Sequence, residues 1–262
     1  MNGFGPLARE AIADALRRRI AAAVALAALV SVLMLESCTS CSPSVNVNGQ
    51  LREMTELAGP AGLGAFVVLG LWVIALAGVL AADHLQSTLE DGSALLALAR
   101  PIARDSFALA RLAGVLGLAF CAGLVMLGSA AALLATRSGL PVAPALAAGA
   151  ACTLGCIAVA ALAMTASLLL PRAATLLLVI GGVWLTAFAN TLGSFAEIGG
   201  WLGALDRLGP PLASAMALAL TPWLEGVAIQ GDPVRIYARL AAWAIAGVLT
   251  LVYAFRRVEL RG

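Results

Sequence analysis

Long apolar runs separated by short arginine-bearing segments dominate the hydrophobic pattern of this chain. A helix needs about 17–25 mostly apolar residues to cross the hydrocarbon core of a bilayer. Six runs reach or approach that length, and we expect each to form a transmembrane helix: Ile20–Leu35, Ala61–Ala82, Leu112–Thr136, Val142–Leu170, Ala173–Ala196 and Leu240–Phe255. Arginines beside the two shortest runs, the first and the last, can snorkel to the interface. The pattern predicts an all-α membrane protein, with residues 1–262 forming one transmembrane domain of six transmembrane helices.

A further uncharged run, Leu208–Leu224, is interrupted by prolines at both ends. Pro210 and Pro211 open it and Pro222 closes it, and proline breaks a continuous helix. A seventh span would also move the basic C-terminal end of the last helix to the opposite side of the membrane. We therefore predict a re-entrant or interfacial helix inside an outer segment of residues 197–239.

The first 19 residues have a different pattern, that of an amphipathic helix. Leu7, Ala11 and Ala15 recur at helical spacing, and charged residues such as Arg9 and Asp14 occupy the other side. Such a segment favours the membrane interface. We expect residues 1–19 to form an interfacial helix ahead of the first span.

Composition narrows the possible functions. The chain is 62% hydrophobic and 11% charged, against about 45–50% and 25% in soluble domains. All 16 basic residues are arginine, so the lysine that a P-loop ATPase requires is missing. His84 is the only histidine, which disfavours histidine-rich metal sites and a conventional Ser-His-Asp triad. We expect a non-enzymatic protein with no cofactor, and the net charge of +2 gives no sign of nucleic-acid binding.

The distribution of the arginines predicts the orientation of the chain. With the N-terminus inside, 11 of the 16 arginines fall on the cytoplasmic side and 5 on the other. Cytoplasmic loops carry an excess of arginine and lysine. We therefore expect both termini in the cytoplasm and a location in the plasma membrane, in a bacterium the inner membrane.

The cysteines fall into two groups. Cys38 and Cys41 lie in the first outer loop, where an oxidising compartment favours a disulfide. A soft metal such as copper(I) is the alternative for this pair. Cys121, Cys152 and Cys156 lie inside predicted spans, where we expect them to act as small hydrophobic residues.

The loop between the second and third spans, Leu85–Arg111, carries the most informative pattern. Leu85, Leu89 and Leu96 fall on one face of a short helix that Pro101 must end. Asp105 then stands as the N-cap of the next helix. Just before the loop, Asp83 and His84 suggest either an anchor for the helix end or a proton relay. A short apolar-faced helix on the cytoplasmic side needs a partner to cover it.

This loop resembles the signature of ABC-2 type permeases. The family pattern is a glutamate, a Gly-Ser or Gly-Thr pair, leucines, an Arg-Pro turn with a second arginine, and a basic residue that opens the third span. The matching residues are Glu90, Gly92, Ser93, Leu95, Leu96, Arg100, Pro101, Arg104, Phe107 and Arg111. The resemblance extends less specifically to the basic N-terminus and to the ending Tyr253–Leu260. Arg111 departs from the family, in which lysine is common there.

The resemblance implies a permease subunit that dimerises with itself or a paralogue and docks separately encoded ABC ATPase subunits. It implies that ATP hydrolysis by those subunits drives export, or transmits force to an outer partner. The residues expected to couple to the ATPase are Glu90, Gly92, Leu95, Leu96, Arg100, Pro101 and Arg104. Two other classes stay open: a structural membrane subunit of a complex without an ATPase, and an intramembrane enzyme.

Overall fold

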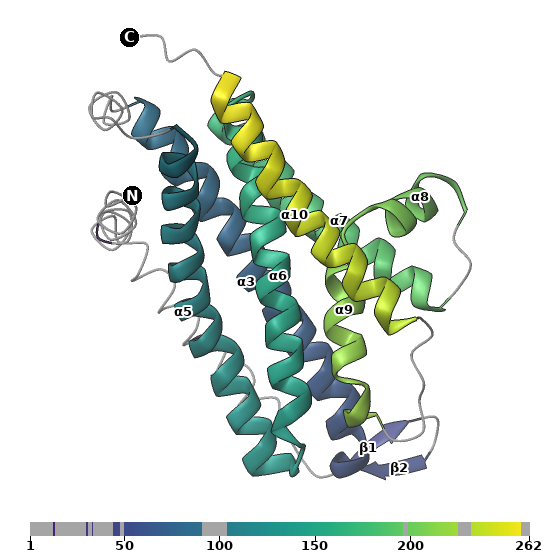
Figure 1. The fold of residues 1–262 in the computed structure, drawn as a ribbon. Coiled ribbons are helices and arrows are strands. Elements are labelled where there is room, and N and C mark those ends of the chain that lie inside the picture. Colours follow the sequence, from purple (N-terminus) through teal and green to yellow (C-terminus); the bar gives the residue numbers. More distant parts are fainter. Residues whose placement is uncertain are drawn as a thin grey trace.

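The computed structural model describes residues 44–47, 50–90, 104–195, 199–224 and 232–257, apart from three single positions nearer the N-terminus. Nearly all of these residues are helical (Figure 1). The long helices are α3 (Met54–Glu90), α5 (Arg104–Ser138), α6 (Val142–Ser167), α7 (Arg172–Phe195) and α10 (Pro233–Arg257). Two short helices, α8 (Gly200–Leu208) and α9 (Leu212–Ala219), and the 3-10 turn η1 (Thr221–Trp223) stand between α7 and α10.

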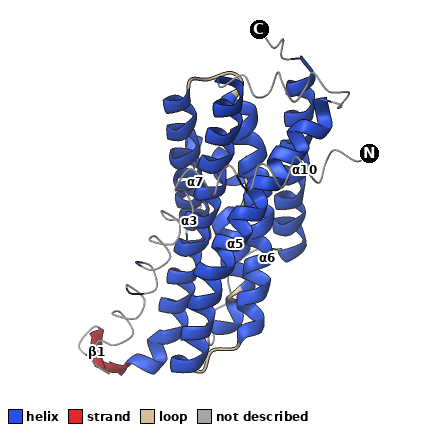
Figure 2. Ribbon diagram, turned by 90° about the vertical axis from the view of Figure 1, so that its left-hand side faces the viewer, coloured by secondary structure: helices blue, strands red, loops and turns tan. Residues whose placement is uncertain are grey.

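Within the described residues, five helices are long and apolar enough to cross a membrane. They correspond to the second to sixth predicted spans, so those five segments are confirmed as helices, although α6 ends three residues and α7 one residue before the predicted bounds. The first predicted span, Ile20–Leu35, and the predicted interfacial helix of residues 1–19 lie outside the described residues, except for Ala13, Val30 and Leu33. Figure 2 shows the long helices running alongside one another as a bundle.

Helix α3 is longer than the sequence pattern predicts. It continues without a break from the apolar run to Glu90, and Leu85 is fully buried against the other helices. The short helix predicted in this loop, with Leu85, Leu89 and Leu96 on one face, therefore begins within α3, and residues 91–103 lie outside the described residues. The N-cap prediction for Asp105 is wrong: α5 begins at Arg104, and Asp105 lies in its first turn, where its carboxylate binds Arg256 of α10.

Helix α6 lies at the centre of the bundle, against α3, α5, α7, α9 and α10. Small residues bring the helices close together, as is common in membrane bundles. Gly78 of α3 faces Val159 of α6 and Val179 of α7, and Gly247 of α10 faces the backbone carbonyl of Ala158. The short turn from α5 to α6 contains Gly139 at φ 65°, a conformation that glycine adopts most readily.

The segment Leu208–Leu224 is broken, as its prolines predict. Helix α9 has eight residues, about 12 Å at 1.5 Å per residue, too short to cross a bilayer. It packs against α3, α6, α7 and α10 and buries Leu212 and Met216 among them. The side chain of Trp223 then donates to the carbonyl of Pro141 at 2.9 Å and holds η1 to the start of α6.

A two-stranded antiparallel hairpin precedes α3 and was not predicted. Strands β1 (Ser44–Val47) and β2 (Gln50–Glu53) pair with Val47 opposite Gln50. The signal was present in the sequence, because Asn48-Gly49 between alternating residues is typical of a tight hairpin. The hairpin adjoins the start of α3, at the lower end of the bundle in Figure 1.

Candidate functional site: charged contacts where four helices end

Four long helices meet at the upper end of the bundle in Figure 1: α3 and α10 end there, and α5 and α7 begin there. Charged and polar side chains from all four gather at this end. We call this group the arginine end, and it comprises Asp83, His84, Asp105, Arg111, Arg172 and Arg256.

The first contact joins α3 to α7 through an ion pair between Asp83 and Arg172. The side chains are 16% and 57% exposed, respectively. An arginine in the first turn of a helix lies at the positive end of the helix dipole, which is unfavourable. The carboxylate of Asp83 offsets that repulsion, so the contact fixes where α7 begins relative to α3.

The second contact joins α3 to α5 and is buried. Nη1 of Arg111 lies 3.0 Å from Nε2 of His84, and the two residues are 4% and 5% exposed. A guanidinium has only donors, so the imidazole accepts this hydrogen bond at Nε2 and is neutral, with its proton on Nδ1. The pair therefore holds the last turns of α3 against the start of α5.

Aromatic rings cover the same arginine. Its guanidinium carbon lies 5.3 Å from the ring centroid of Phe107, within the range of a cation–π contact. Phe107 stacks on Phe255 of α10, with ring centroids 5.8 Å apart. The buried cation thus connects α3, α5 and α10 in one packed unit.

The third contact joins α5 to α10. Nε of Arg256 lies 2.8 Å and 3.0 Å from the two carboxylate oxygens of Asp105, and Nη2 also contacts that carboxylate. Asp105 is in the first turn of α5 and Arg256 in the last turn of α10, the ends at which each charge favours the helix dipole. Both side chains are partly exposed, so this ion pair contributes little to the stability of the fold. Its main effect is to fix the start of α5 next to the end of α10.

Together the three contacts link α7 to α3, α3 to α5, and α5 to α10. Residues 91–103 leave α3 and return to α5 at this same end. A displacement of that loop would therefore act directly on helices whose ends are already joined. The three contacts thus hold the ends of these four helices together.

The described residues contain only part of the predicted coupling set. Glu90 is the last residue of α3, and Arg104 is the exposed first residue of α5. The remaining predicted site residues lie outside the described residues: Gly92, Leu95, Leu96, Arg100, Pro101, and the cysteines Cys38 and Cys41. The interpretation of Asp83 and His84 as an anchor for the helix end agrees with the contacts that both side chains make.

The partners of these residues were not predicted from the sequence. Arg111 was assigned to the family pattern, Arg172 to the cytoplasmic side, and Arg256 to that side, to snorkelling beside the last span and to the family-like ending. The available signal was the position of Asp83 and Asp105 near helix ends, where arginines of other helices also end or begin. Which arginine meets which carboxylate depends on the tertiary arrangement.

A second polar group fastens α8 to α7 and α10. The amide of Asn190 donates to the carboxylate of Asp206 at 2.9 Å, and Arg239 donates to the carbonyl of Arg207 at 3.0 Å. The indole of Trp243 donates to the carbonyl of Leu208 at 2.9 Å. These contacts hold the turn from α8 to α9 in place. In the part of the chain that the structure describes, no three residues of His, Cys, Asp or Glu lie together as a metal site would require.

Long apolar helices with charges gathered near their ends define the class of this chain: it has the architecture of a multi-pass α-helical membrane protein. No protein-family model matches the chain, and no curated protein sequence matches it significantly.

Proposed function

We propose that this chain is the permease subunit of an ABC-2 type ABC transporter. In this proposal, ATP hydrolysis by separate ATPase subunits drives export or transmits force across the membrane. The observation that carries it is the position of Glu90 and Arg104, the two helix ends that the family-like loop connects. The loop connects α3 to α5 at the end where charged contacts join four helices. The chain has no lysine, which a P-loop ATPase requires, and this supports ATP hydrolysis by a separate subunit.

The proposed membrane arrangement has six spans, Ile20–Leu35 being the first, and both termini in the cytoplasm of the bacterial inner membrane. The arginine end then faces the cytoplasm, in agreement with the excess of arginine expected there. Helices α8 and α9 form the outer re-entrant element, because α9 is packed between spans instead of lying on the surface of the bundle. Residues 1–19 lie in the inner interface. Two permease chains, identical or paralogous, form the membrane part of the transporter.

The coupling step follows from the continuity of α3. Closure of the ATPase pair on nucleotide binding presses on the loop after Glu90. Since Glu90 belongs to the same unbroken helix as Asp83 and His84, the force reaches their contacts with α7 and α5 along a rigid element. The helices then tilt as a group and change access across the membrane.

The proposal is tested by charge reversal in the assembled complex. Glu90→Arg and Arg100→Glu are purified with the ATPase subunit, and complex formation and ATP hydrolysis are measured in nanodiscs. Arg137→Glu is the matched control, because it reverses an exposed charge at the opposite end of α5. Only variants with the membrane insertion of the parent are compared.

We expect Glu90→Arg and Arg100→Glu to weaken assembly, or to preserve it while changing the rate of ATP hydrolysis by the complex, with Arg137→Glu like the parent. Parent-like assembly and hydrolysis in both loop variants would overturn the coupling role. Failure to recover any ATPase with the parent chain would favour a structural membrane subunit instead.

A further inference from the structure

Three sulfur-bearing side chains from two helices are buried inside the bundle, away from the arginine end. Helix α6 contributes Cys152 and Cys156, and α9 contributes Met216. The two cysteines line a cavity of about 850 Å³ between α3, α5 and α6. Its other lining residues are nearly all apolar, and the group is not used in the proposed coupling step.

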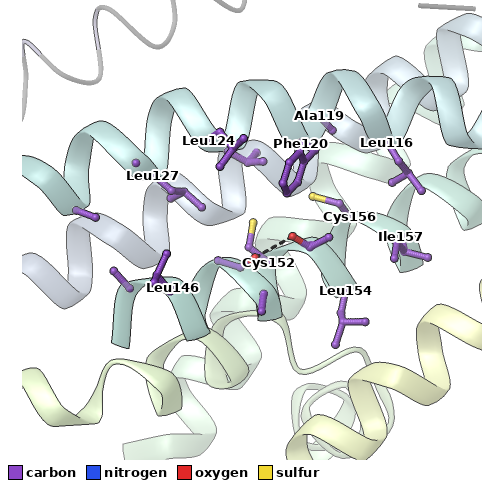
Figure 3. Close-up of a pocket in the computed structure, with 18 of the residues that line it drawn as sticks. Leu116, Ala119, Phe120, Leu124, Leu127, Leu146, Cys152, Leu154, Cys156 and Ile157 are labelled. Carbon is purple, nitrogen blue, oxygen red and sulfur yellow. Dashed lines mark hydrogen bonds between the residues drawn. The ribbon is translucent and has the colours of Figure 1, made fainter. Parts of the chain in front are cut away.

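The two thiols share one face of α6 because they are four residues apart. Figure 3 shows both sulfur atoms pointing from α6 toward the helix that carries Phe120. The thiol of Cys152 donates to the carbonyl oxygen of Gly70 at 3.5 Å and is within hydrogen-bonding reach of the Cys156 thiol. Both cysteines are at least nine-tenths buried.

The thioether of Met216 and the thiol of Cys152 both lie close to Gly70 of α3. A Cβ atom placed on Gly70 would overlap the Met216 sulfur and lie 3.8 Å from the Cys152 sulfur. The Met216 sulfur therefore occupies the space that a side chain at position 70 would fill, and the Cys152 sulfur lies in contact with that space. Glycine at this position of α3 leaves room for the methionine of α9 close to Cys152.

The chemistry of this donor set selects a class of ligand. Thiolate and thioether sulfurs are soft donors, which favour Cu(I) over hard cations that require oxygen ligands. A structural zinc site needs four nitrogen or sulfur ligands, and the described residues contain no group of three or more His, Cys, Asp and Glu. Two or three sulfurs instead match the low coordination numbers of Cu(I).

We propose that Cys152, Cys156 and Met216 form an intramembrane binding site for Cu(I). On binding, one thiol releases its proton to solvent and coordinates as a thiolate. One thiolate and one monovalent cation give a neutral complex, which an apolar site tolerates far better than a net charge. The second thiol and the thioether complete the coordination as neutral donors. This site does not depend on the proposed transporter function.

The test uses the full-length purified protein and Cu(I) itself. Cys38→Ser/Cys41→Ser is the background, because the outer pair could also bind copper. Cu(I) affinity and stoichiometry are measured by competition with a chromophoric chelator under reducing conditions. Cys121→Ala is the matched control, since Cys121 is an exposed thiol on α5.

We expect the background protein to bind one Cu(I) per chain with only sulfur ligands in its X-ray absorption spectrum. Cys152→Ala and Cys156→Ala should each abolish this binding, and Cys121→Ala should leave it unchanged. Met216→Leu should weaken it by about tenfold or more, since even groups outside the ligand sphere contribute tenfold to a hundredfold.

A second readout protects the test against variants that fold poorly. In the background protein itself, bound Cu(I) should shield Cys152 and Cys156, but not Cys121, from alkylation during brief unfolding, as measured by mass spectrometry. Absence of Cu(I) from the background protein, or equal loss of binding in Cys121→Ala, would refute the site. In that case the three sulfurs serve only to pack α6 against α9.

Discussion

Replacing Gly78 with alanine tests how closely the central helices approach. The added Cβ would lie 2.6 Å from Cγ1 of Val179 on α7 and 2.8 Å from Cγ1 of Val159 on α6. Both valines are buried, and β-branched side chains have few alternative rotamers. The helices must therefore move apart.

Overpacking of this kind costs about 1–3 kcal/mol. Alanine recovers up to about 1 kcal/mol because it favours helix over glycine. The net expectation for Gly78→Ala is a loss of up to about 2 kcal/mol of unfolding free energy.

The same helix supplies the control. A Cβ on Gly64 would meet nothing within 4 Å, so Gly64→Ala carries the gain in helix propensity without the clash. We expect it to equal or exceed the parent in stability. Thermal and denaturant unfolding in one detergent, followed by tryptophan fluorescence, compares the two variants with the parent.

Adding Val179→Ala to Gly78→Ala should restore part of the loss, because it removes the nearer of the clashing groups. If Gly78→Ala proves as stable as Gly64→Ala, the close approach of α3, α6 and α7 is wrong. If the second substitution gives no relief, the destabilisation comes from a cause other than this contact.

Two further predictions concern the arginine end and the membrane arrangement. Arg172→Glu should cost about 1 kcal/mol or less, as expected for a partly exposed pair, and Asp83→Arg/Arg172→Glu should recover most of that loss; additive losses in the same unfolding assay would argue against the pair. Reporter fusions should give an external signal after Gly199, the exposed residue before α8, and a cytoplasmic one after Gly262. The opposite result at either position would exclude the six-span arrangement.

The apolar pattern of the sequence determined the existence and type of the long helices. The predicted run Val142–Leu170 and helix α6 begin at the same residue, and the predicted Ala173–Ala196 differs from α7 by one residue at each end. These features are local, because a helix satisfies its own backbone hydrogen bonds and its length follows from its apolar residues. The helix breaks at Pro210, Pro211 and Pro222 before α10 are also local, because the proline ring removes the backbone N–H and clashes with the preceding helical turn.

The tertiary structure decided which side chains of different helices contact one another across the bundle. Asp105 and Arg256 form their pair although 151 positions separate them in the chain, and Met216 approaches Cys152 only because α9 folds back between the spans. Helix α3 extends to Glu90, and its Leu85 is fully buried among the other helices. Periodicity shows which face of a helix is apolar, but many helix arrangements bury the same faces. Which side chains become neighbours is selected by close packing among all the helices together, and no single segment contains that information.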